Sequence, residues 1–163
     1  MHSFLFNTVS DVLSGPGTSG QLGEMAAAMG IERLFVVTDP GIIQFGLLQQ
    51  AVESLEANNI ALHIYSDIVA DPPESVVMNA MHAAQDFGCD GVIGFGGGSS
   101  MDVAKLLAVL IKGEQQLADI YGVDQIIGGR LPLIQVPTTA GTGSEATMVS
   151  IITTGETTKA GVV

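Results

Sequence analysis

With 163 residues, the chain has the length of a single domain and can bury a hydrophobic core of its own. Its formal net charge of −12, from seventeen acidic and five basic residues, argues against nucleic acids and anionic membrane surfaces as partners. No apolar run approaches the roughly 18 residues that span a membrane, no signal peptide is evident, and the one cysteine, Cys89, cannot form a disulfide within the chain, so we expect a cytoplasmic protein.

Hydrophobic periodicity and turn residues divide the chain into alternating strands and helices. In the first half we expect a strand or hairpin arm at residues 4–9, a helix at 22–29, a strand at 33–38, a helix at 45–55 and a strand at 60–65. In the second half we expect a helix at 76–84 that opens after Asp71-Pro72-Pro73 and closes near Gly88, a strand at 91–95, a helix at 101–111, a strand at 133–136, and a closing hairpin made of residues 146–153 and 159–163. Strands that alternate with helices imply right-handed crossovers. The sequence therefore predicts one α/β domain, residues 1–163, with a mostly parallel, doubly wound sheet and an added β-hairpin.

The polar residues that interrupt this pattern fall where strands end. In sheets of this kind, ligands bind beyond the carboxyl ends of the strands. Four polar interruptions lie there: Asp39, Asp71, the glycines at 96–98 and the pair Thr138-Thr139. We therefore expect one ligand crevice along this edge of the sheet, although Asp71, which precedes a proline, also suits a plain turn.

The segment from Gly94 to Lys105 joins a predicted strand to a predicted helix through three consecutive glycines. Glycines there let a phosphate approach the backbone, and the free N–H groups and dipole of a helix start attract an anion. Ser99 or Ser100 is the expected N-cap, and Asp102 is expected in the first turn. The spacing matches neither the strict dinucleotide fingerprint nor the Walker motif, and the glycines could serve only a tight turn. Three of them followed by two serines nevertheless favour pyrophosphate binding.

Other candidate residues have both a functional and a structural interpretation. Asp39 could accept hydrogen bonds from an adenosine ribose, or it could only cap the helix that follows. The histidines His2, His63 and His82 show no metal-binding spacing and are interpreted as structural. Cys89 is expected to be a small buried hydrophobic residue.

Apolar residues make up 47% of the chain and charged residues 13%, which is apolar for a free-standing domain. This surplus predicts a surface that packs on another domain or subunit. We therefore expect a homo-oligomer, and we expect the isolated chain to self-associate.

Two motifs together resemble those of the iron-containing (group III) alcohol dehydrogenase family. Residues 96–105 (GGGSSMDVAK) look like the cofactor motif of that family, residues 136–145 (VPTTAGTGSE) look like its second cofactor loop, and residues 37–41 (VTDPG) are similar to its adenosine-side turn. The resemblance covers essentially the whole chain. It implies a Rossmann-like N-terminal dinucleotide-binding domain, which a helical domain follows in the family, and the interconversion of an alcohol and an aldehyde or ketone with NAD or NADP.

The resemblance also implies which residues bind the cofactor. Asp39 would contact the adenosine ribose, which favours NAD over NADP, and the glycine turn would hold the pyrophosphate. The implied cofactor-binding residues are Asp39, Gly96, Gly97, Gly98, Ser99, Asp102, Thr138, Thr139, Thr142 and Lys159, of which the last five would line the path toward the nicotinamide. Asp71 stands where relatives commonly carry Asn, so no contact is assigned to it. In the family a divalent metal, iron or zinc, is held by one Asp and three His of the helical domain, so we expect no metal ligand and no catalytic residue in this chain.

Two alternatives to a cofactor domain of an alcohol dehydrogenase remain open. One is a stand-alone nucleotide-binding or interaction module without catalysis, because the metal domain is missing. The other is a domain of a related glycerol dehydrogenase or maleylacetate reductase, because the substrate depends mostly on the helical domain. We expect the 163-residue chain to have no dehydrogenase activity by itself.

Overall fold

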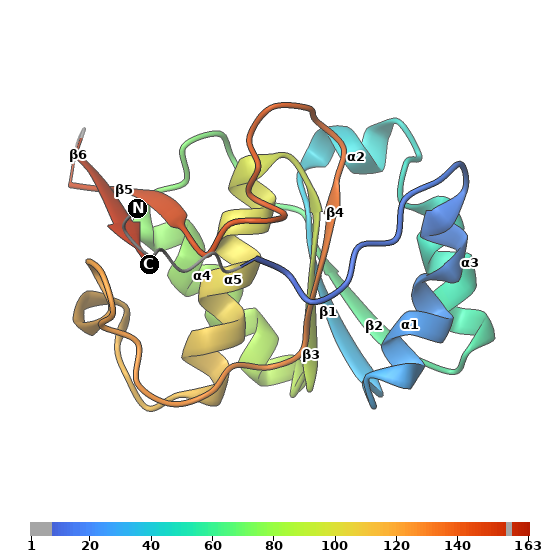
Figure 1. Ribbon diagram of the computed structural model, residues 1–163, viewed down its shortest axis with the longest axis horizontal. Coiled ribbons are helices and arrows are strands. Elements are labelled where there is room, and N and C mark those ends of the chain that lie inside the picture. Colours follow the sequence, from blue (N-terminus) through green and yellow to red (C-terminus); the bar gives the residue numbers. More distant parts are fainter. Residues whose placement is uncertain (1–7, 156–157) are drawn as a thin grey trace, which may run out of the picture.

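A computed structural model describes residues 8–155 and 158–163, and a four-stranded parallel sheet forms its centre (Figure 1). The strands are β1 (Arg33–Val37), β2 (Ala61–Tyr65), β3 (Gly91–Gly96) and β4 (Leu133–Pro137). They lie in the order β2-β1-β3-β4, and every neighbouring pair is parallel. The central strands β1 and β3 are buried except for Arg33, in keeping with the uninterrupted apolar runs at residues 34–37 and 91–96.

Helices cover both faces of the sheet, as Figure 1 shows. One face carries α1 (Leu22–Ala28), α2 (Pro40–Gln44) and α3 (Gln49–Ala57), and the other carries α4 (Glu74–Phe87) and α5 (Gly98–Lys112). Two short 3-10 helices, η1 (Thr18–Gln21) and η2 (Leu117–Asp119), complete the set.

Two hydrophobic cores lie on opposite faces of the sheet, because successive strand residues point to opposite sides. In β1, Leu34 and Val36 belong to the core on the side of α1, α2 and α3. Phe35 and Val37 belong to the core on the side of α4 and α5. The predicted doubly wound, Rossmann-like α/β fold is confirmed.

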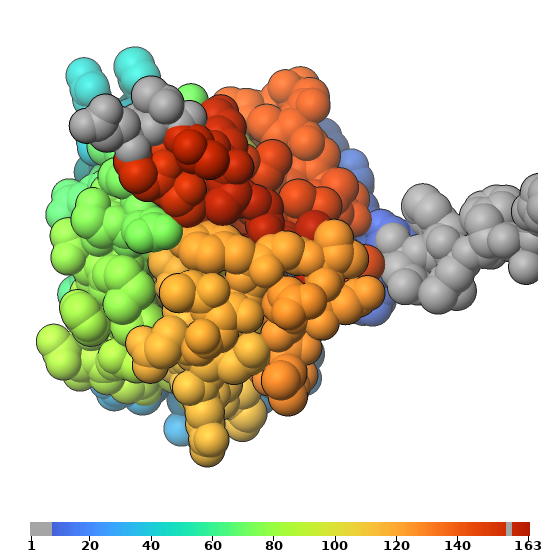
Figure 2. Space-filling view, turned by 90° about the vertical axis from the view of Figure 1, so that its left-hand side faces the viewer, coloured from blue at the N-terminus to red at the C-terminus, as the bar shows by residue number. Residues whose placement is uncertain are grey.

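A separate antiparallel hairpin, β5 (Ser150–Thr154) and β6 (Thr158–Val162), lies beside α4 and α5. The Thr153 N–H donates to the carbonyl of Pro72 over 2.9 Å, and the Gly122 N–H donates to the carbonyl of Gly161 over 2.9 Å. Figure 2 shows the red hairpin against green α4 and the amber segment that follows α5. The predicted hairpin is confirmed, but its first strand begins at Ser150 and not at residue 146, because the backbone makes a turn at residues 143–147.

The helix predicted at residues 45–55 is wrong as a single element. Asp39 caps α2, with Pro40 at the first helical position, so a helix begins earlier than predicted. Gly46 has a φ of 66°, which breaks the helical path before α3 starts. Phe45 is 75% exposed, so it does not lie on the buried face that the periodicity indicated.

The start of α5 also differs from the prediction, because its N-cap is Gly97 and not Ser99 or Ser100. Strand β3 runs through Gly96, and the chain turns into the helix immediately afterwards. The strand predicted at residues 4–9 lies mostly outside the described residues, and residues 8 and 9 belong to no strand.

Candidate functional site

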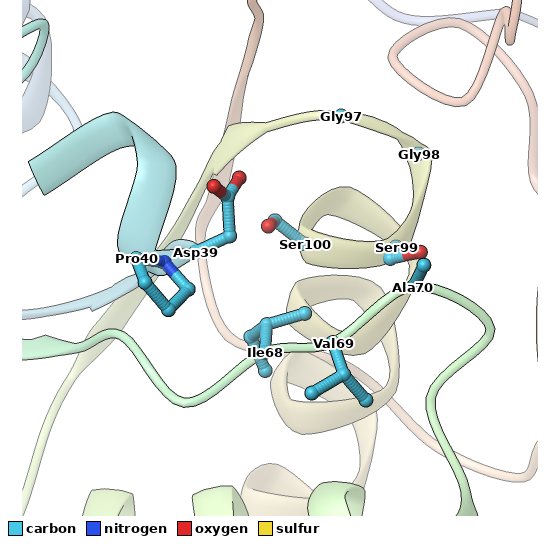
Figure 3. Close-up of a pocket in the computed structure, with 9 residues that line it drawn as sticks. All are labelled: Asp39, Pro40, Ile68, Val69, Ala70, Gly97, Gly98, Ser99 and Ser100. Atoms are coloured by element: carbon cyan, nitrogen blue, oxygen red, sulfur yellow. The ribbon is translucent and has the colours of Figure 1, made fainter. Parts of the chain in front are cut away.

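A cleft opens where the carboxyl ends of β1 and β3 lie side by side. The chain leaves β1 through α2 and α3 on one face and leaves β3 through α5 on the other, so this is the topological switch point of the sheet. The cleft has a volume of about 340 Å³. It is drawn in Figure 3, and its lining residues are Asp39, Pro40, Ile68, Val69, Ala70, Gly97, Gly98, Ser99 and Ser100.

The glycine turn (residues 96–98) and the start of α5 form one wall of this cleft. The first hydrogen bond of α5 runs from the Met101 N–H to the Gly97 carbonyl over 3.2 Å. The N–H groups of the residues before Met101 therefore have no partner along the helix. They point out of the N-terminus of a 15-residue helix, which is where an anion is stabilised.

The three glycines of the turn have different reasons to be glycine. Gly96 has a φ of 151°, and a Cβ atom there would lie 2.9 Å from the Ser100 hydroxyl, so the fold itself requires it. Gly97 has ordinary extended angles, φ −83° and ψ −173°, and a Cβ atom there would lie 3.5 Å from Thr139. Neither backbone strain nor packing requires glycine at position 97. A glycine at this position leaves the backbone open to the cleft, where a ligand could approach it.

Asp39 serves the helix and faces the cleft at the same time. Its Oδ1 accepts hydrogen bonds from the N–H groups of Gly41 (2.9 Å) and Ile42 (3.2 Å), so the structural interpretation as a helix cap is confirmed. A Cβ atom at Gly96 would lie 3.1 Å from the other oxygen, Oδ2. Figure 3 shows the carboxylate beside the glycine turn, with the Ser100 hydroxyl pointing toward it. The cap therefore leaves one carboxylate oxygen on the side of the cleft.

The threonine loop (residues 138–149) follows β4 and reaches the glycine turn. The Thr138 N–H donates to the Gly96 carbonyl over 2.9 Å. A Cβ atom at Gly97 would lie 3.5 Å from Thr139, and one at Gly98 would lie 3.2 Å from Thr142. The structure thus brings these three predicted threonines to the predicted glycines, although more than 40 residues separate them in the sequence.

Asp102 does not lie in the first turn of the helix, where the sequence analysis predicted it. Because α5 begins at Gly98, Asp102 is beyond the first turn, and the prediction that it interacts with the start of the helix is wrong. Its Oδ1 accepts from the Ser144 hydroxyl, and its Oδ2 accepts from the Ile151 N–H over 3.0 Å. It also pairs with Lys105, whose amine lies 3.4 Å away, and burial lowers the pKa of Lys105 despite the nearby acidic group. A contact between Asp102 and a cofactor stays a prediction.

Lys159 lies on β6 and forms an ion pair with Asp71 over 2.6 Å. Both side chains are more than half exposed, and neither residue lines the cleft. Asp71 lies in a bend before α4 with a φ of 49°, in keeping with a turn residue. The assignment of Lys159 to the cofactor path stays a prediction.

Three apolar lining residues, Ile68, Val69 and Ala70, were missed by the sequence reasoning. They follow β2 and form the wall of the cleft opposite the glycine turn (Figure 3). Polar residues and glycines mark a ligand site at a strand end, whereas an apolar segment there carries no such signal. The strand order is the signal that identifies this segment: because β2 lies beside β1, the residues after β2 lie beside those after β1.

Among the described residues, His63 and Cys89 have structural surroundings and His82 is exposed on α4, whereas His2 lies outside the described residues. His63 stacks on Phe35 with the ring centroids 5.3 Å apart, and Cys89 is buried, which raises the pKa of its thiol. Within residues 8–155 and 158–163, no three His, Cys, Asp or Glu side chains come together as a metal site would require. In the same part of the chain, every helix is too short or too polar to cross a membrane.

The sequence model of one protein family, iron-containing alcohol dehydrogenase, matches residues 10–163. Probable alcohol dehydrogenase EutG of Escherichia coli is 37% identical over 147 residues, which are 90% of this chain and 37% of that protein. Sulfoacetaldehyde reductase of Bilophila wadsworthia is 33% identical over 150 residues, which are 92% of this chain and 39% of that protein. The structure of NADH-dependent butanol dehydrogenase A of Thermotoga maritima matches with a TM-score of 0.89 and 30% identity, over 99% of this chain and 41% of that one. The chain thus spans about two fifths of the length of these relatives.

Proposed function

Because the chain belongs to the iron-containing alcohol dehydrogenase family, we propose that its cleft binds a nicotinamide dinucleotide for an enzyme that interconverts an alcohol and an aldehyde or ketone. Membership of this family implies a nicotinamide cofactor and a metal ion. Among the described residues no three metal-ligating side chains come together, and the proposal for this chain concerns the dinucleotide. Residues 1–163 are its dinucleotide-binding domain.

The observation that carries the proposal is the geometry at Gly97. A glycine stands there although its backbone angles suit any residue and its surroundings leave room for a side chain. It lies at the N-terminus of α5, at the switch point of a parallel sheet, and it lines the cleft together with Asp39. An extended ligand with an anionic centre and a ribose on one side fits these features together.

Each part of the cleft has a role in this proposal. The N–H groups at the start of α5 bind the pyrophosphate, and Asp39 Oδ2 accepts hydrogen bonds from the adenosine ribose. The apolar residues Ile68 and Val69 cover the adenosine side. Beyond the lining of the cleft, the family resemblance assigns Thr138, Thr139, Thr142, Asp102 and Lys159 to the nicotinamide side. When bound, the nicotinamide supplies the hydride acceptor or donor.

The substrate is proposed only as a class. The relatives named above include a probable alcohol dehydrogenase, a butanol dehydrogenase and a sulfoacetaldehyde reductase, which share an alcohol or aldehyde group as the reacting centre. We infer the same chemistry for the enzyme to which this chain contributes its cofactor site.

The proposal is tested by calorimetric titration of NADH into the chain and into two matched variants. Gly97→Val places a branched side chain on the pyrophosphate path, whereas Gly129→Val makes the same change at an exposed glycine with no atom near its Cβ position. We expect NADH to bind the wild type and Gly129→Val equally and Gly97→Val at least about tenfold more weakly. Unfolding temperatures of the three proteins check that the fold is kept. Equal affinity of the folded Gly97→Val variant would contradict the proposal.

We also propose that the chain associates with a second copy of itself. Apolar side chains are exposed on residues 8–13 and on the threonine loop, including Val12 (79%) and Met148 (61%), and the Thr8 hydroxyl donates to the Ala146 carbonyl between these segments. Light scattering should give a mass above that of one chain that rises with concentration, and a concentration-independent monomer would contradict this.

The single cysteine supports a cytoplasmic location, which imaging of a tagged chain in its own cells would test.

A further inference from the structure

A buried amine connects helix α5 to the threonine loop. The Lys105 amine donates to the Ser144 hydroxyl over 2.9 Å and to the Val149 carbonyl over 2.8 Å. It also lies 3.5 Å from the Thr147 hydroxyl and 3.4 Å from Asp102 Oδ1. Only 12% of the Lys105 side chain is exposed, so these partners replace the water molecules that normally hydrate an ammonium group.

The neighbouring carboxylate completes this connection. Asp102 accepts from the Ser144 hydroxyl and, over 3.0 Å, from the N–H of Ile151 at the start of β5. Two oppositely charged residues of one helix therefore hold the far end of the threonine loop and the strand that follows it. Hydrogen bonds to charged groups contribute more than neutral ones, and removal of one partner leaves the other charge buried.

The near end of the threonine loop is held at the cleft. There the Thr138 N–H bonds to Gly96, and Thr139 and Thr142 stand beside the glycine turn. Lys105 itself follows Gly98 by seven residues, about 10 Å along the helix axis, and it does not line the cleft. Lys105 is therefore too far away to contact a ligand in the cleft, whereas the loop that it holds reaches the glycine turn.

We propose that Lys105 is a positioning residue that fixes the threonine loop, so that Thr139 and Thr142 face the nicotinamide half of a bound dinucleotide. This inference rests on the proposed function, including its assignment of Thr139 and Thr142 to the nicotinamide side. It differs from a direct attraction between the amine and the pyrophosphate, because such an attraction would act on every ligand with a pyrophosphate. Positioning of the loop acts on the ligand parts that the loop touches.

The experiment compares Lys105→Met with Lys112→Met, which makes the same change at an exposed lysine in the last turn of the same helix. Calorimetry gives the affinities for NADH and for ADP, which has the adenosine and the pyrophosphate but no nicotinamide. Hydrogen exchange reports the opening of residues 138–151 in the unliganded chain. Because Lys105→Met leaves Asp102 unpaired and could unfold the chain, Ser144→Ala is the second variant, since it removes the central hydroxyl without removing either charge.

For Lys105→Met we expect NADH affinity to fall about tenfold, ADP affinity to stay within about twofold, and exchange of residues 138–151 to rise selectively. Ser144→Ala should show the same pattern at about threefold, Lys105→Arg should recover most of the NADH affinity, and Lys112→Met should match the wild type. Equal weakening of ADP and NADH, or unchanged loop exchange in Lys105→Met, would overturn the proposal. If the wild type and Gly97→Val both fail to bind NADH, the proposed function fails, whereas the exchange measurement still decides whether Lys105 holds the loop.

Discussion

Replacement of Asp39 by serine should separate its two tasks, helix capping and discrimination between cofactors. Serine is also a good N-cap, so Asp39→Ser should keep the hydrogen bonds to Gly41 and Ile42 and cost only a few tenths of a kcal/mol, whereas Asp39→Ala should cost about 1 kcal/mol. A carboxylate within ~4 Å of the 2′-phosphate of NADP repels it by about 1 kcal/mol in water and about 4 kcal/mol near a protein surface. Asp39 is half-buried, so its charge should disfavour NADPH by a factor between roughly 5 and 700.

Titration of the wild type, Asp39→Ser and Asp39→Ala with NADH and NADPH measures this preference. We expect the wild type to prefer NADH, and we expect the ratio of the two affinities to fall at least about fivefold in both variants. The unfolding temperature should fall more in Asp39→Ala than in Asp39→Ser. Tighter binding of NADPH by the wild type, or an unchanged ratio in Asp39→Ser, would refute the assignment of Asp39 to the ribose.

Three further predictions concern the packing of the chain and two of its ionisable groups. Gly94→Ala should destabilise the chain by about 1–3 kcal/mol in denaturant unfolding, because the added Cβ would lie 2.9 Å from the Met101 backbone, and a loss below 0.5 kcal/mol would contradict this contact. The Cys89 thiol should react with a thiol reagent at neutral pH only after unfolding, because burial raises its pKa, and stoichiometric labelling of the folded chain would contradict that. Burial and the bond to Glu74 raise the pKa of Tyr121, so its contribution to stability is present below pH 10 and is lost as the pH rises further. The unfolding temperature of Tyr121→Phe should therefore decline less steeply above pH 10 than that of the wild type.

The alternation of elements was predictable because each central strand is buried on both faces. Residues 33–38 and 91–95 are short apolar runs bounded by turn residues, and both became strands at the middle of the sheet. The break that divides the helix predicted at residues 45–55 was harder to predict from the sequence. Its apolar spacing continues through Gly46, and only the combination of the Asp39 cap, Pro40 and a positive φ at Gly46 separates α2 from α3.

The polar part of the cleft was also predictable, since parallel strands bring their carboxyl ends to one edge. Asp39 and the glycine turn lie there as expected, and the threonine loop reaches the glycine turn. The network around Lys105 was not predictable, because it depends on how residues 144–151 fold back over α5. Contacts of this kind join residues about 40 positions apart, and no local pattern encodes them.

The most direct test of the cofactor site is an NMR titration of the ¹⁵N-labelled chain with NAD. The backbone N–H groups of Gly97, Gly98 and Ser99 should shift most strongly and with one shared affinity, because the proposal places them against the pyrophosphate. The exposed Gly129 should not shift. Saturable binding that leaves the first three signals unmoved while others shift would contradict the assignment of this cleft to the dinucleotide.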